Sequence, residues 1–230
     1  MFLADGQDIF LNQNLHKILL LFAKFNVKVN ALIMARKTNY LDFFRVVGKS
    51  KRLPRTGWVR EKIKNPESIA ERSFRVGVLS MILSDELKVN KEKLMKMSLI
   101  HDLGETYTGD LVWTRGEIVD INMREEKEKK ELRGMIKLFN SLENGSQFIK
   151  IFEEMIDGIT EEAKVFWQID KLEMALQALE YELEQNKNLD EFFMNADLVI
   201  REPVLRKILE EILKERESVK RVGVQNYESS

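Results

Sequence analysis

The stretch VFWQIDKLEMALQALEYEL, which runs from Val165 to Leu183, has an apolar residue at every third or fourth position. The members of this stripe are Val165, Ile169, Leu172, Leu176, Leu179 and Leu183. The spacing follows the 3.6-residue period of an α-helix, so it predicts one helix of about five turns with a single buried face. Asp170 lies beside that face, where a carboxylate needs a partner or water.

The same periodicity extends over nearly all of the chain. Near the C-terminus it is repeated by Leu205, Ile208, Leu209, Ile212 and Leu213. Alternating β-branched residues are rare, and the chain has only 11 glycines and 3 prolines to interrupt helices. The sequence therefore predicts an all-α protein.

Local signals predict where one central helix begins. In NPESIAERS, Asn65 can cap a helix and Pro66 suits the first helical position. Ser68 and Glu71 have the spacing of a capping box. We expect this helix to continue to about Leu87.

Asn90 is a second candidate N-cap, and the helix that it begins should end near HDLGE. Gly104 in that segment suits a left-handed helix stop. The charged segment NMREEKEKKEL is predicted to open a solvated helix, in which apolar spacing resumes at Met135.

Composition limits the class of protein. The chain has 230 residues, a net charge of -1 and 44% hydrophobic residues, which suits one globular domain and gives no electrostatic case for a nucleic-acid partner. It has no cysteine, so disulfides and thiolate metal sites are excluded. The apolar run from Ile18 to Ala23 is too short to span a membrane, and we expect a cytoplasmic protein.

The stretch HDLGETYTGD, from His101 to Asp110, concentrates ionisable groups. An adjacent imidazole and carboxylate can bind one divalent cation, and Glu105 follows Asp102 at helical spacing. A metal flanked by carboxylates can polarise a phosphate and activate water. The simpler alternative is a histidine at a helix C-terminus that interacts with the helix dipole, followed by ordinary turn residues.

This stretch resembles the signature of the HD-domain metal-dependent phosphohydrolases. The chain is most similar to the archaeal and eukaryotic relatives of the bacterial 5'-deoxynucleotidases. Five segments carry the resemblance in order: KRLPRTGWV (51–59), NPESIAERSFRV (65–76), HDLGETYTGD (101–110), EEKEKKE (125–131) and QIDKLEMALQALEYE (168–182). The resemblance implies an HD-domain helical bundle, and we expect this domain over residues 39–217. The residues before it (1–38) are expected to form an extra N-terminal helical segment, and the last residues (218–230) a flexible tail. The resemblance also implies a homodimer.

The resemblance further implies the residues of the site. His101, Asp102 and Asp170 match metal ligands for manganese, cobalt, magnesium or zinc. Glu105 matches the carboxylate that orients or deprotonates the attacking water, and Asp110 matches a second acidic residue. On the helix of Asp170, Glu173 and Gln177 are expected to hydrogen-bond around the ligands.

Arg55 and Trp58 match the substrate side of the family's site. An arginine can hold a phosphate with two donors, and an indole can form a wall against a sugar or base. The alternatives are a surface ion pair for Arg55 and simple packing for Trp58.

Arg72 stands where the family has its first histidine ligand. A guanidinium has donors only and stays protonated, so it cannot bind a metal. Arg72 could turn outward and leave a three-ligand site. It could instead turn inward, form ion pairs with Asp102 and Asp170, and replace the metal. The other histidine, His16, lies outside the matched segments and is expected on a helix surface.

Two functions follow from the resemblance. The first is a divalent-metal phosphohydrolase that releases phosphate from (deoxy)nucleoside 5'-monophosphates. The second is a catalytically impaired relative, in which Arg72 plugs the metal site and the chain binds nucleotides or acts in assembly. A guanosine-polyphosphate hydrolase is a third possibility, although the RTGW and EYE segments favour the smaller substrate.

Overall fold

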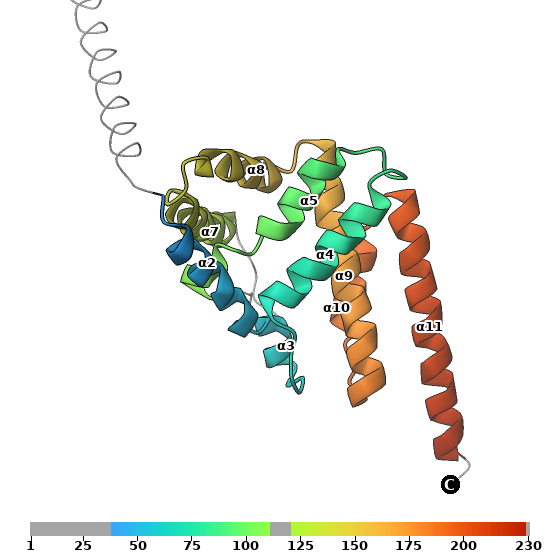
Figure 1. Ribbon diagram of the computed structural model, residues 1–230. Coiled ribbons are helices and arrows are strands. Elements are labelled where there is room, and N and C mark those ends of the chain that lie inside the picture. Colours follow the sequence, from blue (N-terminus) through green and yellow to red (C-terminus); the bar gives the residue numbers. More distant parts are fainter. Residues whose placement is uncertain (1–37, 111–120, 229–230) are drawn as a thin grey trace, which may run out of the picture.

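The computed structural model describes residues 38–110 and 121–228, and this part of the chain is a bundle of helices (Figure 1). In chain order the elements are α2 (Tyr40–Val47), the 3-10 helix η1 (Gly48–Arg52), α3 (Thr56–Arg60), α4 (Ile69–Leu83), α5 (Lys91–Ile100), α6 (Glu105–Thr108), α7 (Ile121–Phe139), α8 (Gly145–Asp157), α9 (Glu161–Gln185), α10 (Asp190–Val199) and α11 (Pro203–Glu228). The β-pairing within these residues is a single isolated bridge between Pro54 and Ser68. The predicted all-α fold is confirmed.

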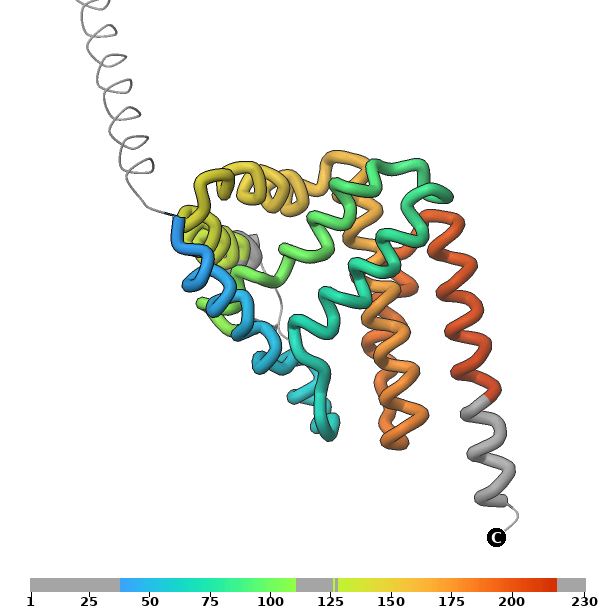
Figure 2. Tube along the Cα trace, in the orientation of Figure 1, coloured from blue at the N-terminus to red at the C-terminus, as the bar shows by residue number. Residues whose placement is uncertain are grey.

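Helix α9 lies at the centre of the bundle. It contacts α4, α5, α8, α10 and α11, and the tube view shows it passing between the pair α4–α5 and the C-terminal helices (Figure 2). The predicted stripe is buried at Val165, Ile169, Leu172 and Leu179. The prediction is wrong at Leu183, which is 46% exposed. Tyr181 is the buried residue at this end of the helix. Leu183 follows it by two positions, which is a rotation of about 200° around the helix axis, so Leu183 points to the opposite side.

Helix α4 begins later than the sequence predicted. Ser68 is the N-cap, and its side chain and that of Glu71 form the predicted capping box. Asn65 does not cap the helix, because it has a left-handed backbone (φ 52°) and the segment after it pairs with the preceding chain. The amide of Arg55 donates to the carbonyl of Glu67 at 2.9 Å, which holds Arg55 at the start of α4. The regular helix ends at Leu83, before the predicted Leu87.

The turn between α5 and α6 packs against α7, and this contact explains Gly104. Asn90 caps α5 as predicted. The left-handed stop at Gly104 was a wrong prediction, because its φ is −58°. A Cβ on Gly104 would lie 2.7 Å from the carbonyl oxygen of Glu131, so a glycine is needed for the close approach of α7. Met135 of α7, where apolar spacing was predicted to resume, is fully buried.

The ends of the chain bear on the predicted domain limits. Leu205, Leu209 and Ile212 of α11 are buried as predicted, and the backbone of this helix continues to Glu228. The N-terminal extension lies outside the described residues except for its last position, so the division into segments stays a prediction. His16 also lies outside them. Among the helices that the structure describes, none is long and apolar enough to cross a membrane.

The close approach at Gly104 gives a test of the fold. We expect Gly104→Ala to lower the free energy of unfolding by about 1–3 kcal/mol, because a methyl group must push α7 away. Urea denaturation measures this change. Gly48→Ala is the matched control, since Gly48 has φ −60° and no atom within 4 Å of the added Cβ. Equal stabilities for the two variants would contradict the close contact.

Candidate functional site

The residues singled out in the sequence come together from four separate segments. Arg55 precedes α3, and Arg72 lies on the first turns of α4. His101 and Asp102 follow the end of α5, and Asp170 lies in α9. Ion pairs and hydrogen bonds connect these groups directly, and they also reach Glu105 and Asp110. The structure thus brings the predicted set together, except that Trp58 lies beside it rather than in its ion-pair network.

His101 presents one nitrogen to two carboxylates. Its Nδ1 lies 2.8 Å from the carbonyl oxygen of Ser98, which fixes the ring. Its Nε2 lies 3.0 Å from Oδ2 of Asp102 and 3.8 Å from Oδ1 of Asp170. This buried Nε2 makes no aligned hydrogen bond to any described residue. A histidine anchored through one nitrogen and aimed at carboxylates through the other is the arrangement of a metal ligand.

Arg72 points inward and binds those same carboxylates. Its Nη2 donates a hydrogen bond to Oδ1 of Asp170, and its Nε lies 3.9 Å from Oδ2 of Asp102. Its Nη1 lies 3.0 Å from Oε2 of Glu173. The side chain is only 3% exposed. Of the two orientations expected for Arg72, the structure has the inward one.

The site as arranged does not fit a divalent metal. The oxygens of Asp102 and Asp170 that face Nε2 of His101 are the ones that Arg72 approaches. Across the ranges 38–110 and 121–228, no group of three or more His, Cys, Asp or Glu side chains is arranged to hold a metal ion. A guanidinium carries positive charge but offers no lone pair, so it neutralises the carboxylates without completing a ligand set.

Arg55 connects this cluster to the remaining acidic residues. Its Nη1 lies 3.0 Å from Oδ2 of Asp102, 3.3 Å from Oε2 of Glu105 and 3.1 Å from Oδ1 of Asp110. The backbone amide of Thr56 donates to the other oxygen of Asp110 at 2.6 Å. The side chain of Arg55 is 17% exposed, so the alternative of a surface ion pair is wrong.

The charges shift the pKa values of the carboxyl groups in opposite directions. Burial alone would raise the pKa of Asp102, but His101 and Arg55 outweigh it and hold that pKa far below its usual value. Arg72 does the same for Asp170. Burial, followed by the Asp102 carboxylate, raises the pKa of Glu105 to about 10. Glu105 therefore holds a proton at neutral pH while Asp102 and Asp170 are charged.

Trp58 is part of a packed wall beside the cluster. It is 2% exposed, and its ring stacks on Phe192 with a centroid distance of 4.3 Å. Its Nε1 donates to Oε1 of Glu67 at 2.7 Å, and Tyr181 accepts from the amide of Glu67 at 2.8 Å. Trp58 contributes mainly to packing, and only part of it borders the adjoining cavity.

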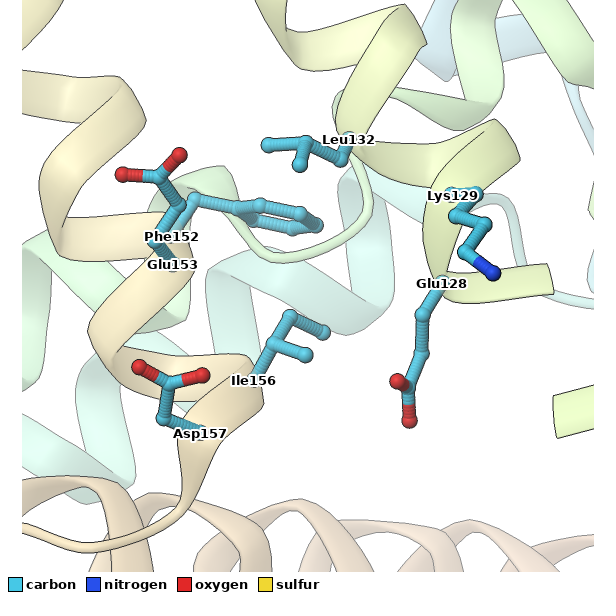
Figure 3. Close-up of a pocket in the computed structure, with 7 residues that line it drawn as sticks. All are labelled: Glu128, Lys129, Leu132, Phe152, Glu153, Ile156 and Asp157. Atoms are coloured by element: carbon cyan, nitrogen blue, oxygen red, sulfur yellow. The ribbon is translucent and has the colours of Figure 1, made fainter. Parts of the chain in front are cut away.

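A cavity of about 290 Å³ opens beside Arg72 and Arg55. Its lining includes four cationic side chains and one carboxylate, together with apolar and amide groups: Arg55, Gly57, Trp58, Arg60, Arg72, Lys171, Met174, Glu191, Phe192 and Asn195. A second cavity, of about 220 Å³, lies between α7 and α8 and is drawn in Figure 3. Phe152, Leu132 and Ile156 line that cavity, and none of the site residues reaches it. The cavity beside Arg72 is the candidate ligand site because Arg55, Trp58 and Arg72 line it.

The sequence predicted some of the surrounding residues and missed others. Glu173 accepts hydrogen bonds from Arg72 and Arg75, and Gln177 accepts one from Arg75, so these residues bond to the arginines rather than to the predicted ligands. Lys171 was missed, although its Nζ lies 3.1 Å from Oδ2 of Asp170. Phe192 was also missed, because nothing in the sequence relates α10 to the KRLPRTGWV segment. A lysine next to the site aspartate was the one signal available for Lys171.

Fold and site together define a class. The chain is an all-α bundle in which an adjacent His–Asp pair at one helix end faces a distant aspartate on another helix. A family model described as "HD domain" matches residues 47–213. The chain belongs to the HD-domain phosphohydrolase family of enzymes.

Curated relatives and solved structures agree with this assignment. The chain is 35% identical over 182 residues to the 5'-deoxynucleotidase HDDC2 of Danio rerio, covering 77% of this chain and 88% of that protein. It is 34% identical over 191 residues to the 5'-deoxynucleotidase hdd1 of Schizosaccharomyces pombe, covering 80% and 93%. A conserved hypothetical protein from Pyrococcus furiosus has a similar structure, with a TM-score of 0.62, 33% identity and coverage of 76% and 99%.

The buried carboxyl of Glu67 predicts a pH dependence of stability. Burial, followed by the Glu173 carboxylate, raises its pKa from 4.5 to about 7. Between these pH values the folded chain binds a proton that the unfolded chain has lost, so the free energy of unfolding falls as the pH rises. We expect Glu67→Gln to remove this decrease. Between the lower and the upper pH, the free energy of unfolding of the variant should rise relative to that of wild type by on the order of 2–3 kcal/mol.

Urea denaturation of both proteins across this pH interval measures the difference. Glutamine keeps a carbonyl oxygen to accept from Nε1 of Trp58, so packing is preserved. Glu143→Gln, a change at an exposed position, is the control and should leave the pH profile unaltered. Parallel profiles for wild type and Glu67→Gln would show that Glu67 does not hold the extra proton.

Proposed function

We propose that this chain releases phosphate from (deoxy)nucleoside 5'-monophosphates in the cavity beside Arg55. The proposal is supported by the relatives named 5'-deoxynucleotidases and by one observation. Arg55 binds Asp102, Glu105 and Asp110 at the edge of a cavity that also has an aromatic wall. A donor group, two acidic groups and an aromatic surface are what a phosphate on a nucleoside requires.

In this proposal Arg55 receives the phosphate. A phosphate dianion competes with the carboxyl groups for the guanidinium, and so it loosens the hold of Arg55 on Glu105 and Asp110. Glu105 and Asp110 then orient the attacking water. The water oxygen forms a bond to phosphorus, the bond to the 5'-oxygen breaks, and a proton passes by way of Glu105 to the leaving oxygen.

The family's reaction uses a divalent metal, which supplies Lewis-acid polarisation and an activated water when it is bound. His101, Asp102 and Asp170 are the residues of this chain that match its ligands, and Arg72 occupies two of the three. Because the residues as arranged do not fit a metal, the steps above assign no role to one.

A second candidate function is nucleotide binding, or a role in assembly, without turnover. The observation that favours it is the pairing of Arg72 with Asp170 and Glu173, which removes the usual place for a metal. Such a protein would keep the cavity and its cationic lining but lose water activation. It is distinguished from the first candidate by binding of a nucleotide without release of phosphate.

We further propose that the chain works as a homodimer in the cytoplasm. The family resemblance supports this, as does a row of exposed apolar side chains on α4. Phe74 is 69% exposed, Val78 37% and Ile82 62%, and their four-residue spacing puts them on one face. Light scattering should give a dimer for wild type and a monomer for Ile82→Glu. A wild-type monomer would contradict the proposal.

Phosphate release from a panel of substrates tests the proposed reaction. The panel contains deoxynucleoside and nucleoside 5'-monophosphates and a guanosine polyphosphate, each with chelator, manganese, cobalt, magnesium or zinc. We expect release from the monophosphates. Glu105→Gln should lower kcat by at least about 100-fold, because glutamine has no acidic proton to give to the leaving 5'-oxygen.

At neutral pH Glu105→Gln should be at least as stable as wild type, because folding of wild type must protonate a carboxyl that is ionised in the unfolded chain. Glu92→Gln is the matched control, because Glu92 lies on the surface and its side chain is 78% exposed. Its kcat should equal that of wild type. Release from no substrate under any condition, by folded protein, would refute the proposed reaction and leave the binding function.

A further inference from the structure

Three atoms from the predicted ligand residues lie close together at the centre of the site. They are Nε2 of His101, Oδ2 of Asp102 and Oδ1 of Asp170, with the two oxygens 3.0 and 3.8 Å from the nitrogen. Arg72 donates to the aspartate oxygen of α9 and places its Nε 3.9 Å from the other oxygen. One guanidinium therefore spans both oxygens that face the imidazole, which is the place where a cation would bind.

Arg72 is held in this place from behind. Its Nη1 lies 3.0 Å from Oε2 of Glu173, whose other oxygen lies 3.0 Å from Nη2 of Arg75. Glu173 is fully buried, so the loss of Arg72 would leave a buried carboxylate with a weakened partner. Outward rotation of Arg72 is therefore costly, and a divalent ion beside the fixed guanidinium would meet repulsion in a largely dry site.

The cavity next to Arg72 remains suited to an anion. Four cationic side chains line it, each also paired with a carboxylate: Arg55, Arg60, Arg72 and Lys171. Glu191 is the one acidic residue of the lining. The side chain of Lys171 is 30% exposed and that of Arg60 28%, so both can approach a ligand from the open side. A phosphate entering this cavity meets guanidinium and ammonium groups without any metal.

We propose that Arg72 is a built-in cation that takes the place of the divalent metal, and that the chain binds the phosphate of its ligand without one. This inference rests on the proposed function for the identity of the ligand, a nucleoside monophosphate. It concerns how the phosphate is bound and not whether it is released. Arginine side chains neutralise the carboxylates of Asp102, Asp170 and Glu173. The arginine and lysine side chains that line the cavity attract the phosphate.

The first test uses the wild-type protein. Purified chain is incubated with manganese, cobalt, magnesium or zinc, then dialysed, and its metal content is measured. Binding of deoxyadenosine 5'-monophosphate and of inorganic phosphate is measured by calorimetry in the presence of a chelator. We expect no stoichiometric metal, and saturable binding that the chelator does not weaken.

The second test compares two arginine-to-histidine variants. Arg72→His restores a fourth ligand next to His101, Asp102 and Asp170, and it should acquire one metal ion per chain that a chelator removes. Arg75→His is the matched control. Arg75 also pairs with Glu173 but has no ion pair with the three ligand residues, so its variant should stay metal-free. Arg72→Lys, which keeps the charge, should also stay metal-free.

The outcomes separate this inference from the proposed function. A stoichiometric metal ion in wild type that a chelator removes would overturn the inference. Nucleotide binding that requires metal would overturn it as well. Neither result would contradict the proposed release of phosphate. Chelator-resistant binding with no phosphate release supports the inference and refutes the proposed reaction. If Arg72→His fails to fold, the metal content of wild type and of Arg72→Lys still decides the question.

Discussion

The buried ion pairs of Arg72 are the interaction on which the arrangement of the site depends. Asp170 and Glu173 come from the middle of the central helix, where water cannot solvate them, and a buried carboxylate without a partner is strongly destabilising. Arg72 supplies the partner from α4. The same contacts fasten α4 to α9, so charge neutralisation and helix packing are satisfied by one side chain.

The other parts of the site are positioned by chain ends rather than by long helices. His101 and Asp102 follow the last turn of α5, and Arg55 immediately precedes α3. Backbone hydrogen bonds between the segments around Arg55 and Glu67 bring that arginine to the start of α4. Gly104 lets α7 approach the turn that leads into Glu105. Local backbone constraints therefore place charged groups that have no regular element of their own.

In the family's arrangement a histidine at the position of Arg72 leaves room for a metal between two aspartates. With arginine there, the same aspartates bind a cation that is covalently part of the chain. Arginine adds one positive charge at the centre, where a divalent metal would add two. Arg55, Arg60 and Lys171 bring further positive charges to the cavity. In the metal-free site that we propose, the pocket has a cationic lining and hydrogen-bond donation takes the place of Lewis-acid chemistry.

The sequence by itself determined the helical class, the capping box at Ser68, the cap at Asn90 and the identities of the charged site residues. These features depend on periodicity and on contacts between residues a few positions apart, which sequence spacing specifies. Only the tertiary structure decided that Arg72 points inward, that Trp58 packs on Phe192, and that Gly104 serves a helix contact rather than a left-handed turn. Each of these depends on a partner far away in the chain. The direction of Arg72 was left open because both orientations satisfy its local sequence, and only the buried carboxylates of α9 favour one of them.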